Sequence, residues 1–349
     1  MDRSTWLGAC VVVALVAGCS GESDTTFTGT GGHGGLGTGG SSTGGSGTGG
    51  SGTGGNPPAA PDPNLDGPYT YAELDAGFTV AATGHQVAIH CAYPTAGPDA
   101  GPYPVVVFGH GFQLPPSQYY GYVRRLASFG YVALTVDFPA GFVGNKHTDN
   151  ARDLVAGLDW AAQAPELAGK ADTTHAGASG HSLGGKAALL GATYDARIDA
   201  AIALDPVDSA MQCSAQDCPD VSALMPGLAI PTGFVGELTD ATGGFQACAP
   251  AADNYTTFYA GAQSPSLEVT VVGANHMSFL DDVASCGFTC SFCNAATLDN
   301  ATVNGLGRAY VVAFYERWLR GLDAYDSYLT GALAEARYVG PGLVTLQSK

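Results

Sequence analysis

Residues 180–185 have the sequence Gly-His-Ser-Leu-Gly-Gly, which fits the pattern G-x-S-x-G around Ser182. The run of small residues before it, 174–179, has the character of a buried strand, and 186–192 contain strong helix formers. On such a strand-to-helix turn, a serine is lifted out of the sheet to the positive end of the helix dipole. Because the chain holds 51 glycines, the pattern alone does not identify a nucleophile, and its partners must be found.

A general base for Ser182 is the first of these partners, because a serine hydroxyl is a poor nucleophile at neutral pH. In folds that use such a turn, the serine, the acid and the histidine follow one another in that order along the chain. His276 is the only histidine after Ser182, and it lies in a loop just past a predicted strand. The sequence therefore predicts His276 as the base.

Three aspartates are candidates for the acid that orients the histidine ring. Asp205 ends a predicted strand directly after the helix that follows the serine, and Asp240 follows the next strand. Asp208 lies deeper in the loop after Asp205 and is the weakest of the three. Position along the chain favours Asp205 and leaves Asp240 as the alternative.

The oxyanion of a tetrahedral intermediate needs two backbone N–H donors held ready for it. One is expected from Leu183, the residue after the serine, and the other from Phe112, in the loop after an apolar strand. The histidines beside these positions, His110 and His181, are expected to brace the loops and not to act as bases. Apolar residues expected to line a substrate pocket are Phe112, Leu114, Phe142, Met277 and Phe279.

Alternating strands and helices must bring these residues together. After a hairpin at 78–93, apolar runs predict strands at 104–108, 131–138, 174–179, 200–204, 231–235 and 267–272, the last of them. Helices are predicted at 117–129, 149–163, 186–192, 253–262 and 303–319, with Thr148 or Asp149 and Asp253 as caps. Strands that are apolar throughout predict an α/β fold with a mostly parallel central sheet and helices on both faces. Ligands bind at the carboxyl ends of such strands, where all the candidates fall.

The first 65 residues are not expected to belong to the folded domain. Residues 1–18 contain an apolar run too short to span a membrane, and Val-Ala-Gly-Cys at 16–19 is typical of a lipoprotein signal peptide. We expect Cys19 to carry a lipid, so that the protein is exported and anchored to a membrane of the cell envelope or surface. Residues 19–65 predict a flexible linker rich in Gly, Ser, Thr and Pro, whose tract at 29–55 reaches roughly 30 Å. The folded domain is then expected at 66–349.

Charge and cysteines limit the partners. A net charge of −18 with only 13 basic residues argues against nucleic acid, whose phosphates need basic clusters.

The cysteines beyond Cys19 favour disulfides in an exported protein; they are Cys91, Cys213, Cys218, Cys248, Cys286, Cys290 and Cys293. Cys213 and Cys218 are close enough to bridge across one loop, and the other pairings stay open. The spacing of Cys286, Cys290 and Cys293 is that of a metal site, but no histidine lies nearby, so we expect no metal.

Three blocks of sequence resemble plant chlorophyllases, their bacterial relatives and, more distantly, platelet-activating-factor acetylhydrolases. They are Gly-His-Ser-x-Gly-Gly-Lys at 180–186, Ala-Leu-Asp-Pro-Val-Asp at 203–208 and His-Met-Ser-Phe-Leu-Asp-Asp at 276–282. The strand and loop at 105–112, Cys-Ala-Pro at 248–250, Asn254 and the Phe-Tyr pair at 258–259 fit as well, so that the resemblance covers about 104–322. It implies the α/β-hydrolase fold and a Ser–Asp–His esterase, and it places the acid at Asp205. Leu183 stands where chlorophyllases usually have arginine.

Together these features predict a chlorophyllase-like serine carboxylic ester hydrolase that acts on small or lipophilic esters through an acyl-enzyme. This chemistry needs no metal or organic cofactor. A lipase, a cutinase-like polyester hydrolase and a dienelactone-type hydrolase are the alternatives on the same scaffold. A non-catalytic binding lipoprotein is a further alternative, which the presence of all three candidate residues disfavours.

Overall fold

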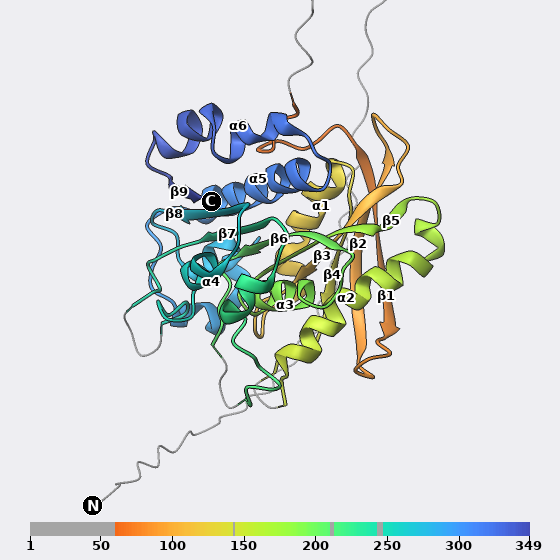
Figure 1. Ribbon diagram of the computed structural model, residues 1–349, viewed down its shortest axis with the longest axis horizontal. Coiled ribbons are helices and arrows are strands. Elements are labelled where there is room, and N and C mark those ends of the chain that lie inside the picture. The colour runs from red at the N-terminus through yellow and green to blue at the C-terminus, as the bar shows by residue number, and fades with distance from the viewer. Residues whose placement is uncertain (1–59, 142–143, 210–212, 243–246) are drawn as a thin grey trace, which may run out of the picture. The chain divides into compact units, whose positions relative to one another are not determined.

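The computed structural model describes residues 60–141, 144–209, 213–242 and 247–349 of the 349-residue chain. Across these ranges nine strands form one sheet with the order β1-β2-β4-β3-β5-β6-β7-β8-β9 (Figure 1). The six strands from β4 to β8 in this order are parallel, and the antiparallel pairs are β1–β2, β2–β4 and β8–β9. This topology is that of an α/β-hydrolase, and the predicted fold class is confirmed.

The strands are β1 Thr70–Thr79, β2 Gln86–Ala96, β3 Tyr103–Gly109, β4 Val132–Asp137, β5 Ala171–His181, β6 Ile198–Leu204, β7 Thr232–Gly236, β8 Ser266–Val271 and β9 Val344–Ser348. The α-helices are α1 Tyr120–Ser128, α2 His147–Gln163, α3 Leu183–Ala192, α4 Tyr255–Gly261, α5 Asn300–Trp318, α6 Asp326–Leu329 and α7 Ala332–Ala334. Short 3₁₀ segments are η1 Pro116–Tyr119, η2 Pro165–Leu167, η3 Ser222–Gly227, η4 His276–Phe279, η5 Val283–Phe292 and η6 Asp323–Tyr325, and η7 Glu335–Val339 is a π turn.

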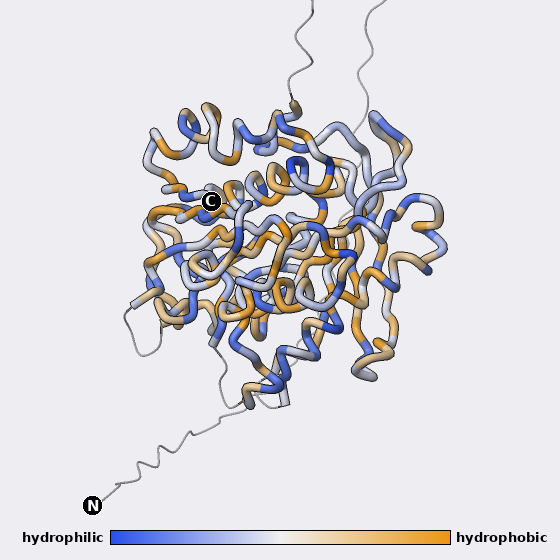
Figure 2. Tube along the Cα trace, viewed as in Figure 1, coloured by the Kyte–Doolittle hydropathy of each residue, from blue (hydrophilic) through white to orange (hydrophobic). Residues whose placement is uncertain are grey.

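Two apolar layers hold the helices against the two faces of the sheet. Along β3, Val105 and Val107 belong to one layer and Val106 and Phe108 to the other, because successive side chains of a strand alternate. Helices α2, α3 and α4 pack with the first pair, and α1 and α5 pack with the second (Figure 1). The apolar stretches in Figure 2 follow the strands in the middle of the sheet. With both faces covered, the carboxyl ends of the parallel strands are where polar side chains can gather.

The C-terminal end of the chain adds a strand that the sequence analysis missed. β8 is not the last strand, because β9 pairs antiparallel with it, from Leu267 opposite Ser348 to Val271 opposite Val344. Only Val344 of β9 is buried. A short edge strand with one buried side chain leaves almost no periodic signal in a sequence.

Two predicted helix caps are wrong. Asn254, and not Asp253, caps α4, because its side chain accepts a backbone N–H two residues further on at 3.2 Å. Helix α2 begins one residue before Thr148, without a side-chain cap. The N–H of Thr148 donates to the carbonyl of Asp217 at 3.0 Å, so a tertiary partner replaces the local cap.

The described cysteines form three disulfides, Cys213–Cys218, Cys248–Cys293 and Cys286–Cys290. The first is the predicted bridge, and the other two use the three cysteines whose spacing is that of a metal site together with Cys248. Cys91 keeps a free thiol, and burial in the sheet raises its pKa. The disulfides thus lie outside the strands and the α-helices, and the thiol lies in the core.

Contacts of the folded part begin before the predicted boundary at residue 66. The carboxylate of Asp62 pairs with Arg337 at 2.6 Å, and the side chain of Asn64 donates to the hydroxyl of Tyr338 at 2.6 Å. Residues 1–59, which include the predicted signal peptide and Cys19, lie outside the described residues. None of the helices in the described ranges has the length and apolar character needed to cross a membrane.

Candidate active site

Ser182 stands at a sharp turn between β5 and α3. Its backbone has φ 56° and ψ −122°, a conformation that L-residues rarely adopt and that lifts the side chain out of the sheet. The turn packs α3 closely against the end of β3, since a Cβ on Gly184 would lie 2.1 Å from the carbonyl oxygen of Gly109. The second glycine of the G-x-S-x-G pattern is therefore required by this close approach. Ser182 itself remains 8% exposed.

Ser182, His276 and Asp205 form a continuous chain of hydrogen bonds. His276 opens η4, just past β8, and its Nε2 lies 2.9 Å from the Oγ of Ser182. Its Nδ1 lies 2.6 Å from Oδ2 of Asp205, which directly follows β6 and has no exposed surface. The structure thus brings together the three residues that chain order favours. Each of them lies just past the carboxyl end of a strand, β5, β6 or β8.

The other two candidate acids make different contacts. Oδ2 of Asp240 accepts the backbone N–H of His276 at 2.8 Å, and its Oδ1 accepts the N–H of Asn294 at 2.6 Å. Asp240 therefore holds the backbone of the histidine loop and not the ring. Asp208 is paired with the ammonium group of Lys186, 2.8 Å from its Oδ1. Of the three aspartates, Asp205 is the one that lies against the histidine ring.

The surroundings of Asp205 determine its own ionisation and, through it, the tautomer of the His276 ring. Burial raises the pKa of Asp205, and the hydrogen bond to His276 opposes this shift. The N–H of Glu237 also donates to Oδ1 of Asp205, at 3.3 Å. An ionised Asp205 in this position stabilises a protonated ring and keeps the proton of neutral His276 on Nδ1. Nε2 is then free to accept the proton of Ser182.

His181 and Tyr119 connect the histidine loop with the loop after β3. The carbonyl of His276 can only accept, so Nε2 of His181, 2.9 Å away, carries a proton. Nδ1 of a neutral His181 then accepts from the hydroxyl of Tyr119 at 2.8 Å, and that oxygen accepts the N–H of Gly111 at 3.2 Å. Burial holds the pKa of His181 well below its usual value, which keeps the ring neutral. These contacts are those of a bracing residue.

The two predicted oxyanion donors lie on segments that flank the serine. Leu183 is the first residue of α3, and the first N–H groups of a helix have no acceptor within the helix. Phe112 lies in the loop after β3, where Nδ1 of His110 is 2.9 Å from the carbonyl of Gly111. The His110 ring stacks on Phe138 with 4.2 Å between ring centroids, which anchors this loop. Both N–H groups remain candidates for the oxyanion site.

Comparison with known proteins places the chain in a family. A family model described as Chlorophyllase matches residues 69–334. The chain belongs to the chlorophyllase family. A bis(hydroxyethyl) terephthalate hydrolase of Streptomyces coelicolor is 30% identical over 57% of this chain and 57% of its own length. Chlorophyllase-2 and chlorophyllase-1 of Arabidopsis thaliana are 28% and 30% identical, over 53% and 52% of this chain and 63% and 61% of their own lengths. The chain thus spans about three fifths of the length of these relatives.

The apolar residues predicted to line a pocket in this chlorophyllase-family chain differ in their surroundings. Leu114 and Met277 are 3% and 7% exposed, and Phe112 is half-buried. Phe279 has no exposed surface, because η4 turns its ring into the core. The structure therefore places Phe279 in the core and not on a surface that a substrate reaches. Phe142 lies outside the described residues.

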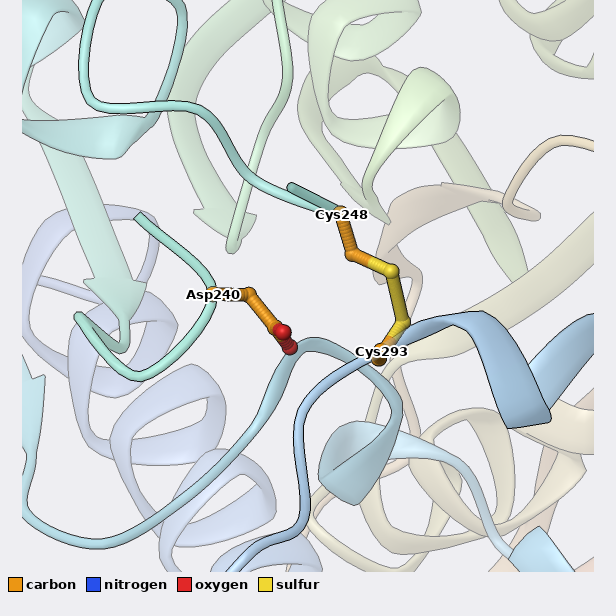
Figure 3. A group of neighbouring side chains, drawn as sticks. All are labelled: Asp240, Cys248 and Cys293. Atoms are coloured by element: carbon orange, nitrogen blue, oxygen red, sulfur yellow. A yellow bond between two sulfur atoms is a disulfide. The ribbon is translucent and has the colours of Figure 1, made fainter. Parts of the chain in front are cut away.

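Asp240 points toward the disulfide between Cys248 and Cys293 (Figure 3). One ligand atom from each of these residues lies within 4.8 Å of the others, a spacing that suits a metal ion. Cysteine ligates metals as a thiolate, whereas these two sulfurs are bonded to each other. Asn294, which follows Cys293, donates its backbone N–H to Asp240. Its carbonyl oxygen accepts the side-chain amide of Asn275 at 2.6 Å. The disulfide and Asp240 therefore hold the histidine loop in place.

Two buried titratable residues beside the site were not predicted from the sequence as part of it. Lys186 has no exposed side chain and pairs with Asp208. Glu237, which directly follows β7, is also fully buried. A signal for Glu237 exists in the sequence, because an acidic residue follows an apolar strand there as Asp205 follows β6. The signal for Lys186 is its position four residues after Ser182, on the same side of α3.

Proposed function

We propose that this protein is a serine carboxylic ester hydrolase that works through an acyl-enzyme. The observation that carries the proposal is the hydrogen-bonded chain from Asp205 through His276 to Ser182, with heavy-atom distances of 2.6 and 2.9 Å. At these distances a general base can take the proton of a nucleophile. The names of the relatives, terephthalate hydrolase and chlorophyllase, support an ester as the bond that is cleaved.

The proposed reaction begins when Oγ of Ser182 attacks the ester carbonyl carbon and Nε2 of His276 takes the hydroxyl proton. The carbonyl π electrons move to oxygen, and the N–H groups of Phe112 and Leu183 stabilise the resulting oxyanion. The tetrahedral intermediate collapses, the bond to the alcohol oxygen breaks, and His276 returns the proton to the leaving alcohol. Water, activated by His276 in the same way, then cleaves the acyl-enzyme and releases the acid. Asp205 stays ionised throughout.

Substitution of Ser182 tests this proposal. Ser182→Ala is expected to abolish hydrolysis of p-nitrophenyl butyrate and labelling by a fluorophosphonate probe. Ser179→Ala is the matched control, because Ser179 lies in the same strand and its Oγ donates to the carbonyl of Ile202 at 2.7 Å, away from the proposed nucleophile. Labelling of folded Ser182→Ala at the wild-type level would contradict the proposal.

The substrates we propose are small or lipophilic esters, and the terephthalate hydrolase relative adds aromatic diesters as a specific candidate. Leu183 supports a substrate other than chlorophyll, since chlorophyllases usually have arginine there. A panel of p-nitrophenyl esters, bis(hydroxyethyl) terephthalate and chlorophyll tests this assignment on the wild type and on Leu183→Arg. Turnover of chlorophyll alone by the wild type contradicts it.

We also propose that the protein is exported and anchored to a membrane through a lipid on Cys19. The support is Val-Ala-Gly-Cys at 16–19 together with three disulfides, which form in oxidising compartments. Cys19→Ser should move the protein from the detergent phase to the aqueous phase in Triton partitioning. If that variant stayed entirely in the detergent phase, a lipid on Cys19 would not be the anchor.

A further inference from the structure

Glu237 lies next to Asp205 of the proposed triad and takes no part in the proposed reaction. Its side chain is fully buried. Its Oε2 accepts the N–H of Asp240 at 2.9 Å, whereas its Oε1 is buried without a hydrogen-bond partner. A carboxyl oxygen of Glu237, a carboxyl oxygen of Asp205 and a ring nitrogen of His276 lie within 4.8 Å of one another. A buried oxygen without a partner, on a carboxyl group that lies this close to the triad, needs a physical explanation.

The explanation lies in the ionisation of the carboxyl groups of Glu237 and Asp205. Two carboxyl groups buried at such a distance do not both ionise, so the pair holds one proton. Asp205 has the histidine ring and a backbone N–H as donors, which favour its ionised form. The titratable groups that face Glu237 are Asp205, His276, Asp240 and Tyr255, and the histidine is already paired with Asp205. The proton of the pair therefore belongs on Glu237.

The protonation of Glu237 follows from the same surroundings. Burial is the main cause that raises its pKa, the negative charge of Asp205 adds to it, and the resulting pKa is about 9. Glu237 is thus neutral near pH 7. A neutral carboxyl group offers one O–H donor, which an ionised one lacks.

We propose that Glu237 is a positioning residue whose neutral carboxyl group donates its O–H to Asp205. This inference rests on the proposed function, because it gives Asp205 the role of orienting His276. Within the described residues, the hydrogen bonds to the carboxylate of Asp205 come from the ring of His276 and the N–H of Glu237. The O–H adds one more donor, which stabilises the ionised carboxylate and fixes its direction.

Loss of the carboxyl proton of Glu237 should destabilise the carboxylate of Asp205. Above about pH 9 an ionised Glu237 no longer donates, and its charge repels Asp205 across less than 4.8 Å. The carboxylate of Asp205 is then destabilised, and the ring of His276 loses its fixed orientation. We therefore expect kcat of the wild type to fall at alkaline pH through the ionisation of Glu237.

Two substitutions of Glu237 distinguish a neutral hydrogen-bond donor at this position from an ionised carboxylate. Glu237→Gln keeps the shape and a donor but cannot ionise, so kcat at pH 7 should stay within about threefold of the wild type, and the alkaline fall should disappear. Glu237→Leu removes the donor and should lower kcat by about 10- to 100-fold with little change in KM. If folded Glu237→Gln lost as much kcat as Glu237→Leu, or kept the alkaline fall, the inference would be overturned.

A second measurement does not depend on turnover. The infrared difference spectrum of the wild type minus Glu237→Gln at pH 7 should contain the carbonyl band of a buried protonated carboxyl group, because the band of Glu316, whose pKa is raised to about 7, is common to both proteins and cancels. Recording both spectra in a Ser182→Ala background separates this inference from the proposed function, since no catalysis is needed. An unchanged spectrum would show that Glu237 is ionised and would overturn the inference, whatever the fate of the nucleophile.

Discussion

The contrast between Asp205 and Asp240 gives the sharpest prediction. Asn at position 205 presents an amide to Nδ1 of His276, 2.6 Å away, and favours the tautomer with the proton on Nε2. That tautomer cannot accept the proton of Ser182. We expect Asp205→Asn to lower kcat by about 10⁴-fold, which corresponds to about 5 kcal/mol of transition-state stabilisation.

Asp240→Asn removes something different. Asp240 accepts two backbone N–H groups, those of His276 and Asn294, and the single oxygen of an asparagine side chain can replace only one acceptor. One buried donor is left unpaired, which lowers the free energy of unfolding by about 1–3 kcal/mol. The ring keeps its partner, so kcat should fall by about tenfold or less.

The assay compares kcat and KM of both variants on p-nitrophenyl butyrate at pH 8, together with their thermal melting. Asp205→Asn should lose mainly kcat, and Asp240→Asn should lose mainly stability. A folded Asp240→Asn that loses more kcat than Asp205→Asn would assign the ring partner to Asp240. A folded Asp205→Asn with more than a tenth of wild-type kcat would refute the reasoning from ring orientation.

Three further substitutions test other parts of the structure. Lys186→Met leaves Asp208 buried without its cation and should lower the free energy of unfolding by about 3–5 kcal/mol in urea titrations; a loss below about 1 kcal/mol contradicts this. Burial raises the pKa of Glu316 from 4.5 to about 7, so as pH rises between these values the free energy of unfolding should fall by about 3 kcal/mol more in the wild type than in Glu316→Gln, since the contribution of Glu237 is common to both proteins. An equal slope in both proteins refutes the assignment. Tyr119→Phe unpairs His181 and should lower kcat by about tenfold with KM unchanged; an equal rise in KM contradicts a bracing role.

Chain order carried most of the prediction of the candidate site. Ser182, Asp205 and His276 each follow a strand whose buried part is recognisable in the sequence, and the carboxyl ends of parallel strands lie along the same side of the sheet. Their proximity therefore follows from local sequence and the sheet rule alone. The parallel core of the fold was predictable for the same reason, because strands buried on both faces leave a strong apolar signal.

Features set by tertiary contacts were not predictable in this way. The choice between Asp205 and Asp240 depends on whether a side chain meets the ring or the backbone of His276, and both positions follow a strand. The burial of Glu237 depends on what surrounds the end of β7, and a glutamate after a strand usually faces water. Phe279 and Met277 both belong to the buried core, with 0% and 7% exposed surface, and nothing in their local sequence gives this difference.

The pairing of Cys248 with Cys293 changes how the molecule is connected. The two cysteines are 45 positions apart, and the disulfide closes a covalent ring that contains α4, β8 and His276. Closure of a ring of this size removes about 4 kcal/mol of conformational entropy from the unfolded chain. A protease that cuts one peptide bond between residues 249 and 292 leaves a single covalent molecule, in which His276 is still tied to the segment that carries Asp240. A cut between Cys248 and His276 therefore separates the proposed base from Ser182 only if the disulfide is also reduced.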